Sequence, residues 1–148
     1  MADLLTLEIA TPTRLVVAET VHEVVIPGSQ GYFGVLPGHA PLLATLGIGE
    51  LMYRKDHAQY HLALTGGFAE VRNDKVIILA ENAERPEEVD RERALRAKER
   101  AERRLGGREA DVDFARAQAA LMRALIRLQV SARSHGEPGA APGTPGRR

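Results

Sequence analysis

The sequence contains no cysteine, which excludes disulfide bonds and thiol chemistry and makes an intracellular compartment the default expectation. Its first residues include Asp3 and Glu8 and lack the basic and then apolar order of a signal peptide. No apolar run approaches the roughly 20 residues that a helix needs to span a bilayer. We therefore expect contact with a membrane only through a protein complex.

The chain also lacks a net charge, since 20 basic residues balance 20 acidic ones, so no overall field favours nucleic acid or an acidic membrane. The charges are unevenly placed along the chain. Residues 1–84 contain five Lys or Arg against ten Asp or Glu, whereas residues 85–148 contain fifteen against ten. An acidic front and a basic back predict two parts with different roles.

Patterns typical of catalytic or metal sites are missing from the sequence. His57 and His61 are four residues apart in a predicted strand, where a rise of about 3.3 Å per residue separates them too far for one ion. No Ser, His and Asp arrangement suggests a nucleophile. The stretch "GSQGYFG" at 28–34 lacks the Gly-Lys-Ser/Thr ending of a phosphate loop. We predict a protein that is not an enzyme and that requires no metal or cofactor.

The front of the chain has the pattern of a β domain. Between residues 4 and 81, about nine short apolar segments alternate with polar residues and are separated by Gly, Pro, Asn or Asp. One of them, "TVHEVVIPG" at 20–28, places Val21, Val24 and Ile26 toward an inner face. This pattern predicts an antiparallel β-sandwich or flattened barrel in residues 1–85.

After Pro86 the pattern becomes helical. Residues 87–105 are almost entirely helix formers, "GG" at 106–107 can end that helix, and a second helix is predicted over 111–133. A short connection makes the two helices antiparallel, so residues 86–133 predict a helical hairpin. Its first helix offers mostly alanine for packing, and its second offers the stripe Phe114, Ala117, Leu121, Leu125 and Leu128.

Such a hairpin buries little apolar surface, and its packing barely exceeds the cost of ordering it. We therefore expect its docking to depend on the sandwich, a partner or a ligand. Residues 134–148 are rich in Gly and Pro and are predicted to be disordered.

Three stretches together carry a family resemblance: "GSQGYFGVLPGHAPLL" at 28–43, "LTGGFAEVRNDKVIILAENAE" at 64–84 and "VDRERALRAKERAERRL" at 89–105. In order and spacing, the chain resembles the epsilon subunits of bacterial F-type rotary ATP synthases from about residue 4 to residue 133. The resemblance implies a sandwich of about ten antiparallel strands followed by a helical hairpin.

The same resemblance implies a place and partners. Such a subunit stands in the central stalk at the cytoplasmic face of the cell membrane, bound to the gamma subunit and the c-ring. Its hairpin folds down on the sandwich, or extends toward the catalytic beta and alpha subunits and inhibits ATP hydrolysis. By the family pattern, the c-ring contact would include Gln30, Tyr32 and His39.

Members of the family that bind ATP carry an aliphatic residue, Asp, two residues, Arg and Ala at the start of the first helix. Residues 89–94, "VDRERA", are similar to that pattern. The resemblance implies an ATP site made of Glu84, Val89, Asp90, Arg93, Ala94, Arg100, Arg123 and Arg127. ATP would be a regulatory ligand that holds the hairpin down.

The spacing of the arginines agrees with this site. Arg93 and Arg100 are two helical turns apart and share a face, and so do Arg123 and Arg127, which are four apart. If the hairpin brings both faces together, the guanidinium groups repel one another unless an anion such as a triphosphate joins them.

Two alternatives stay open. Asp90 could be a helix N-cap and the arginines a solvated face with weak surface pairs. The chain could also be a freestanding β-sandwich binding module whose basic hairpin engages nucleic acid, although no aromatic stacking platform accompanies the hairpin.

Overall fold

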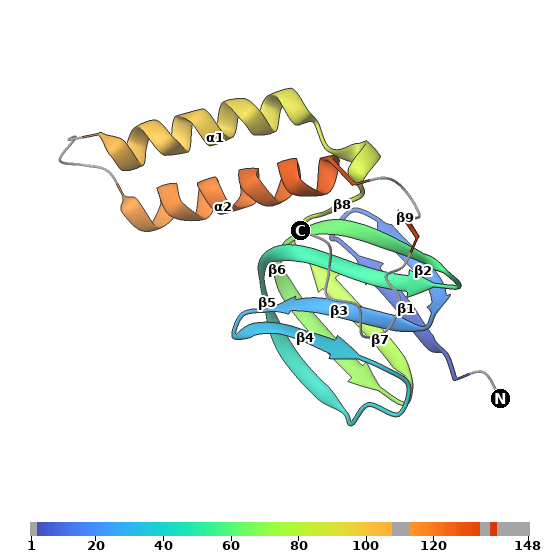
Figure 1. Ribbon diagram of the computed structural model, residues 1–148. Helices are drawn as coiled ribbons and strands as arrows, with labels where there is room; N and C mark the ends of the chain where they lie inside the picture. Colours follow the sequence, from blue (N-terminus) through green and yellow to red (C-terminus); the bar gives the residue numbers. More distant parts are fainter. Residues whose placement is uncertain (1–2, 108–112, 134–136, 139–148) are drawn as a thin grey trace.

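The computed structural model describes residues 3–107, 113–133 and 137–138 and contains a β-sandwich from which a helical hairpin projects (Figure 1). The strands are β1 (Leu5–Ala10), β2 (Leu15–Val21), β3 (Glu23–Gly28), β4 (Gly31–Val35), β5 (Leu42–Lys55), β6 (Ala58–Arg72), β7 (Lys75–Ala80), β8 (Ala83–Glu84) and β9 (Glu137–Pro138). A 3₁₀ turn, η1 (Pro86–Glu88), leads to the helices α1 (Arg91–Gly106) and α2 (Phe114–Ser131). The predicted fold class is confirmed.

Two long strands, β5 and β6, connect the layers of the sandwich. The strand order is β2-β1-β7-β6-β5-β3-β4, with β8 and β9 also paired to β6. The half of β6 from Gly67 to Arg72 pairs with β7, whereas Ala63 and Leu64 pair with β8. β5 and β6 are therefore continuous strands of 14 and 15 residues, whereas the sequence pattern predicted only short segments. The described residues form nine strands, close to the number of about ten that the resemblance implies.

One strand pair departs from the predicted antiparallel arrangement. β1 and β7 are parallel, with Leu7 paired to Val76 and Ile9 to Ile78. The first strand lies between β2 and β7, so a strand far along the sequence completes its hydrogen bonding. Because β1 and β7 are so far apart in sequence, no local turn signal specifies their direction.

The bend in β6 depends on Gly67. Its φ of 124° lies in a region that residues with a side chain rarely adopt. A Cβ atom at this position would lie 2.0 Å from the carbonyl oxygen of Leu79 on the neighbouring strand. The Gly-Gly-Phe stretch therefore lets β6 pass β7 closely while it turns from one layer into the other.

The core between the layers consists of aliphatic side chains from alternate positions of the strands. In β1, Leu5, Leu7 and Ile9 are fully buried while the residues between them are exposed or half-buried. The inward orientation predicted for Val21, Val24 and Ile26 is confirmed, because all three are 0% exposed. Period-2 alternation thus sets the inner face of the sandwich.

The helices begin later than predicted. Asp90 caps α1, because its Oδ1 accepts a hydrogen bond from the backbone N–H of Arg93 at 3.1 Å. Residues 86–88 form η1 instead, in which Glu88 accepts a hydrogen bond from the backbone N–H of Arg85. Asp113 caps α2 in the same way as Asp90 caps α1.

Alanine lines the contact between the two helices. The buried residues of α1 are Ala94 and Ala101, and α2 buries Ala117 and Ala124 at the same spacing of seven. The stripe predicted on α2 is partly confirmed. Ala117 is buried and Leu121 and Leu128 are half-buried, but Phe114 is 56% and Leu125 43% exposed, and the stripe omitted buried Ala124. Small side chains let the helix backbones approach closely, and this determines which face of α2 is buried.

Two residues of the tail that was predicted to be disordered form a short strand. Glu137 and Pro138 form β9, which pairs with Gln59 and Ala58 at the start of β6. The rest of the 134–148 segment lies outside the described residues.

Candidate functional site

The last turns of α2 lie on the outer face of β5 and β6. Five consecutive residues of β6, His61–Thr65, are buried, whereas the strand alternates between buried and exposed residues at its far end. Continuous burial means that both faces of the strand are covered: one by the sandwich core and the other by α2. This contact is where the hairpin meets the sandwich.

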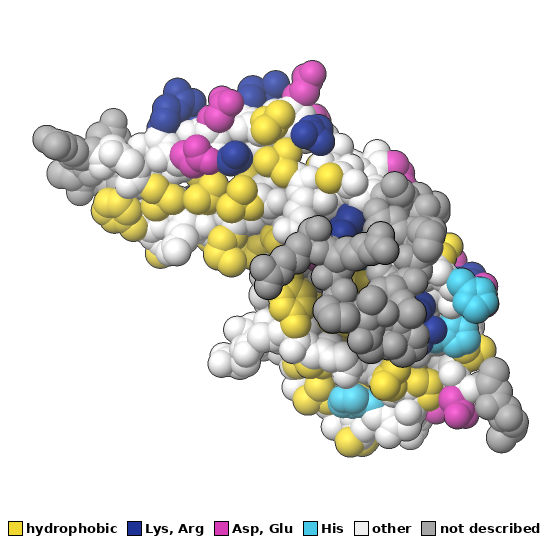
Figure 2. Space-filling model, viewed as in Figure 1, with side chains coloured by type: hydrophobic (Ala, Val, Ile, Leu, Met, Phe, Trp, Pro, Cys, Tyr) yellow, Lys and Arg dark blue, Asp and Glu magenta, His cyan; other side chains and the backbone are white. Residues whose placement is uncertain are grey.

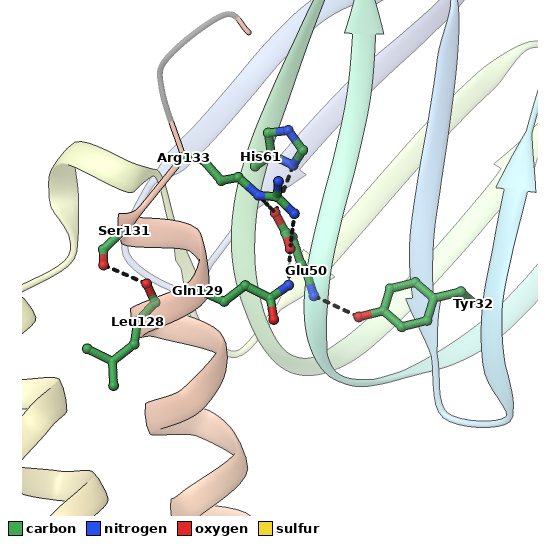
Figure 3. Close-up of polar contacts among 7 residues, drawn as sticks. All are labelled: Tyr32, Glu50, His61, Leu128, Gln129, Ser131 and Arg133. Carbon is green, nitrogen blue, oxygen red and sulfur yellow. Dashed lines mark hydrogen bonds and ion pairs between the residues drawn. The ribbon is translucent and has the colours of Figure 1, made fainter. Parts of the chain in front are cut away.

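Glu50 of β5 lies at the centre of this contact (Figure 3). It is only 8% exposed, and its carboxylate accepts a hydrogen bond from the side-chain amide of Gln129. Arg133, just after α2, donates through Nε to Oε1 at 2.9 Å and through Nη2 to Oε2 at 3.4 Å. On the sandwich side, His61 Nδ1 lies 2.8 Å from Oε1. One carboxylate therefore joins two strands to the end of the hairpin.

The environment keeps Glu50 ionised. Burial alone would raise the pKa of its carboxyl group, because a charge loses hydration there. The hydrogen bonds from His61, Arg133 and Gln129 and the charge of Arg133 outweigh burial and lower the pKa from 4.5 to about 2. The carboxylate is thus an acceptor throughout the physiological pH range.

A second carboxylate lies in the same row of the sheet. Glu50 pairs with Ala63 of β6, and Ala63 pairs with Glu84 of β8. Paired residues project to the same face, so Glu50 and Glu84 lie on either side of the small Ala63, two strand spacings or about 9.6 Å apart. Glu84 accepts a hydrogen bond from Arg127 Nε at 2.6 Å. Two acids in one row therefore hold side chains from the end of α2 and from just beyond it.

The segment between the sandwich and α1 is fastened independently. Arg85 donates through Nη2 to the carbonyl oxygen of Val16 at 2.8 Å. Arg14 forms an ion pair with Glu88 at 2.6 Å. These contacts join β2 and its preceding turn to the linker, so the linker is held to the sandwich up to Glu88.

The predicted nucleotide residues lie on one side of the hairpin. Arg93 and Arg100 each precede a buried alanine of α1 by one residue, and Arg123 precedes buried Ala124 of α2. Each is thus rotated about 100° back from the helix contact. The helices are antiparallel (Figure 1). An equal rotation about each axis therefore points to the same face of the hairpin. Arg127, three residues after Ala124, lies on that face too.

The predicted residues differ in how they are engaged. Arg127 is bound to Glu84, whereas the described residues include no ion-pair partner for Arg93, Arg100 or Arg123 within salt-bridge distance. Glu84, which the resemblance placed in the site, already pairs with one of the four arginines.

Three other predicted residues have structural roles. Asp90 is the N-cap of α1, as the alternative reading of the sequence expected. Ala94 is 2% exposed and belongs to the contact between the helices. Val89 is half-buried and lies on the extended backbone between η1 and α1. These residues shape the site, and their contact with a nucleotide stays a prediction.

The residues predicted for the c-ring do not form one cluster. Gln30 lies in the turn before β4 and His39 in the connection after it, so they lie beyond opposite ends of a five-residue strand. Tyr32 is 58% exposed, yet its hydroxyl oxygen accepts a hydrogen bond from the backbone N–H of Glu50 at 3.0 Å. Tyr32 therefore holds the backbone of Glu50 from the sandwich side. The assignment of Gln30, Tyr32 and His39 to a c-ring contact stays a prediction.

The sequence interpretation missed Glu50, His61, Gln129 and Arg133. A usable signal existed in "LGIGELMY" at 46–53, where one acid stands within an otherwise apolar strand. A carboxylate at such a position is rarely buried without a partner. Only the fold, however, brings the end of α2 to this strand.

Within the described residues, no group of three or more potential ligands is arranged to hold a metal ion. Neither α1 nor α2 has the length and apolar character that crossing a bilayer requires, and the same is true of η1.

Two family models match the chain in sequence order. The first, described as ATP synthase, Delta/Epsilon chain, beta-sandwich domain, matches residues 4–86. The second, described as ATP synthase, Delta/Epsilon chain, long alpha-helix domain, matches residues 87–132. Together they span both parts of the structure.

Relatives and solved structures agree with these matches. An ATP synthase epsilon chain of Nitratidesulfovibrio vulgaris is 53% identical over 124 residues, which cover 84% of this chain and 92% of the relative. That of Citrifermentans bemidjiense is 50% identical over 90% of this chain and 98% of the relative. A chain in the Euglena gracilis mitochondrial ATP synthase structure, described as OSCP/F1/c-ring, has a TM-score of 0.75 at 24% identity, covering 88% of this chain and 82% of that one.

Proposed function

This chain belongs to the family of ATP synthase epsilon chains, and from that membership we propose that it is a non-catalytic central-stalk subunit bound to the gamma subunit and the c-ring. The observation that carries the proposal is the match of both parts, in order, to relatives of about 50% identity over most of their length. The subunit would lie at the cytoplasmic face of the membrane and contact it only through the complex. The freestanding nucleic-acid module is set aside, because both of its supposed parts match the family.

Co-purification tests the proposed assembly. The tagged chain should retain its gamma subunit through a high-salt wash, because a stable interface contains apolar contacts that salt does not screen. It should not shift a labelled oligonucleotide at any salt concentration. Loss of gamma together with a salt-sensitive oligonucleotide shift would overturn the proposal.

The hairpin is the proposed regulatory part. Docked, it lies against the sandwich, and extended, it would reach the catalytic beta and alpha subunits and restrain ATP hydrolysis. Its small alanine contacts and its polar attachment to β5 and β6 support a movable element. Truncation after Arg85 should leave a folded sandwich that binds gamma while hydrolysis by the complex rises. A complex that fails to assemble would contradict this division of roles.

ATP is the proposed ligand of the docked hairpin. Arg93, Arg100, Arg123 and Arg127 share one face of the hairpin, and a triphosphate offers several oxygens for charge-assisted hydrogen bonds to them. Glu84 already orients Arg127 through Nε, which leaves the terminal nitrogens of that guanidinium available to phosphate. Glu84 would also accept from an amino or hydroxyl group of the nucleotide, with Val89 beside the base.

Isothermal titration with ATP tests this site. The wild-type chain should release heat, and Arg123→Ala should weaken binding at least about tenfold, the usual worth of a hydrogen bond to a charged group. Arg96→Ala is the matched control, because Arg96 is exposed. It lies two residues after Ala94, which packs in the contact between the helices, and therefore on the outer side of α1. Absence of heat with the wild-type chain at millimolar nucleotide would refute ATP binding.

A further inference from the structure

The hairpin is attached to the sandwich at two places with different properties. At the start of α1, the linker is fixed up to Glu88 by Arg14 and Arg85. Val89 and Asp90 follow with extended backbone, with ψ of 123° and 94°, before α1 begins. The Val89 N–H bonds back to the carbonyl oxygen of Pro86, and the Asp90 carbonyl accepts from Ala94 N–H in α1. No hydrogen bond of η1 or α1 crosses the link between Val89 and Asp90, so this link is the natural pivot of the hairpin.

At the end of α2, Val130 is fully buried, and the polar part of the attachment centres on Glu50. The sandwich holds this carboxylate in place without the hairpin, because His61 lies beside Oε1 and the Tyr32 hydroxyl accepts from the Glu50 backbone. The hairpin contributes Gln129 and Arg133, and the Arg133 side chain is 39% exposed. Departure of the hairpin would therefore hydrate Arg133 and leave Glu50 with its sandwich partners, so the contact can open without unfolding the sandwich.

We propose that Glu50, Gln129 and Arg133 form a latch that holds the end of α2 on the sandwich and sets the docked fraction of the hairpin without any nucleotide. The latch is separate from the proposed ATP site, because Glu84 and Arg127 form the neighbouring pair in the same row. ATP would then add to a preference that the latch already supplies. The inference rests on the proposed mobility of the hairpin but not on ATP binding.

The absence of cysteine makes the latch measurable in the full chain. Spin labels at R72C, exposed at the end of β6, and Q118C, exposed on α2, report the distance between sandwich and hairpin. Pulsed electron paramagnetic resonance without nucleotide should give one dominant distance for the parent. Glu50→Gln should add a population at a different distance and raise the ratio of undocked to docked molecules about tenfold.

Two further variants make the result decisive. Arg133→Gln removes the same ion pair from the hairpin side, so it tests the latch even if Glu50→Gln impairs folding. Glu70→Gln is the matched control, because Glu70 is exposed on β6 and carries the same charge change. A new population in the latch variants, with the control unchanged, supports the proposal. Parent-like distances in Arg133→Gln and in a folded Glu50→Gln would overturn it, whatever the ATP titration shows.

Discussion

Fully buried positions hold mainly leucine, isoleucine, valine and tyrosine in the β-sandwich, but mostly alanine in the hairpin. Burying a large aliphatic side chain contributes about 1.5–3 kcal/mol, whereas a single methyl group contributes about 0.8 kcal/mol. The sandwich therefore has the core of an independently stable domain. The hairpin does not, and it depends on where it docks.

The two helices of the hairpin have different surfaces. Figure 2 shows apolar side chains along α2 next to charged side chains over α1. Phe114, Met122 and Leu125 are among the exposed apolar residues of α2, while its docked end is held by polar contacts to Glu50 and Glu84. Packing specifies the sandwich, and directional polar contacts position the hairpin.

The largest expected effect comes from the sandwich core. Leu62→Ala removes a fully buried side chain and should cost about 2–5 kcal/mol of unfolding free energy. Leu125→Ala, at a 43% exposed position of α2, should cost less than about 1 kcal/mol. Urea unfolding followed by circular dichroism measures both values. If both substitutions lowered the unfolding free energy equally, the hairpin would stabilise the protein as much as the sandwich core does.

Acid should release the hairpin before it unfolds the sandwich. The pKa of Glu50 is lowered from 4.5 to about 2, so the stabilisation is present above pH 4.5 and is lost as the pH falls toward 2. Protonation should weaken docking of the hairpin by at most about 3 kcal/mol, the value for a released carboxyl group that returns to its ordinary pKa. The R72C and Q118C labels should show a constant docked fraction from pH 8 to about 5 and a fall below that.

Glu50→Gln is the control for that titration, since it has no carboxyl group to protonate at this position. Its docked fraction should be lower at neutral pH and should change less on acidification. If the parent and Glu50→Gln undocked at the same pH, protonation of groups other than Glu50 would be the cause.

Local patterns were enough to predict the β and α parts, because each strand or helix has its own period. They could not predict that β5 and β6 are single bent strands, since Gly47 and Gly66–Gly67 look like ends of strands in the sequence. The parallel pairing of β1 with β7 joins segments nearly a whole domain apart. Such pairing follows from the layering of the sandwich and leaves no local trace.

The site was predictable to a similar degree. Helical spacing alone placed Arg93 with Arg100 and Arg123 with Arg127. The stripe on α2 included Ala117 but took Leu125 in place of the buried Ala124, because leucine was favoured over alanine for packing, whereas close helix approach requires the smaller residue. The Glu50 contact joins β5 to the end of α2, so only the tertiary structure reveals it.

A smaller effect is expected from overfilling the helix contact. Ala101→Leu puts a large side chain into the contact between the two helices. Overpacking should destabilise that contact by about 1–3 kcal/mol and push the helices apart. The sandwich should be unaffected, because Ala101 lies in α1 and packs toward α2. Helical circular dichroism and the label distance should change while the main unfolding transition stays in place. Ala115→Leu, at an exposed position of α2, should leave all three unchanged.

The smallest effect separates two roles of Asp90. As the N-cap of α1, it should contribute about 1 kcal/mol, which Asp90→Ala removes and Asp90→Ser largely retains. A carboxylate that also contacts ATP would be lost in both variants. If capping is its whole role, Asp90→Ser should titrate with ATP like the wild-type chain, and only Asp90→Ala should bind more weakly. Equal weakening in both variants would instead assign the carboxylate to the nucleotide, so the pair of substitutions distinguishes a residue that shapes the hairpin from one that touches its ligand.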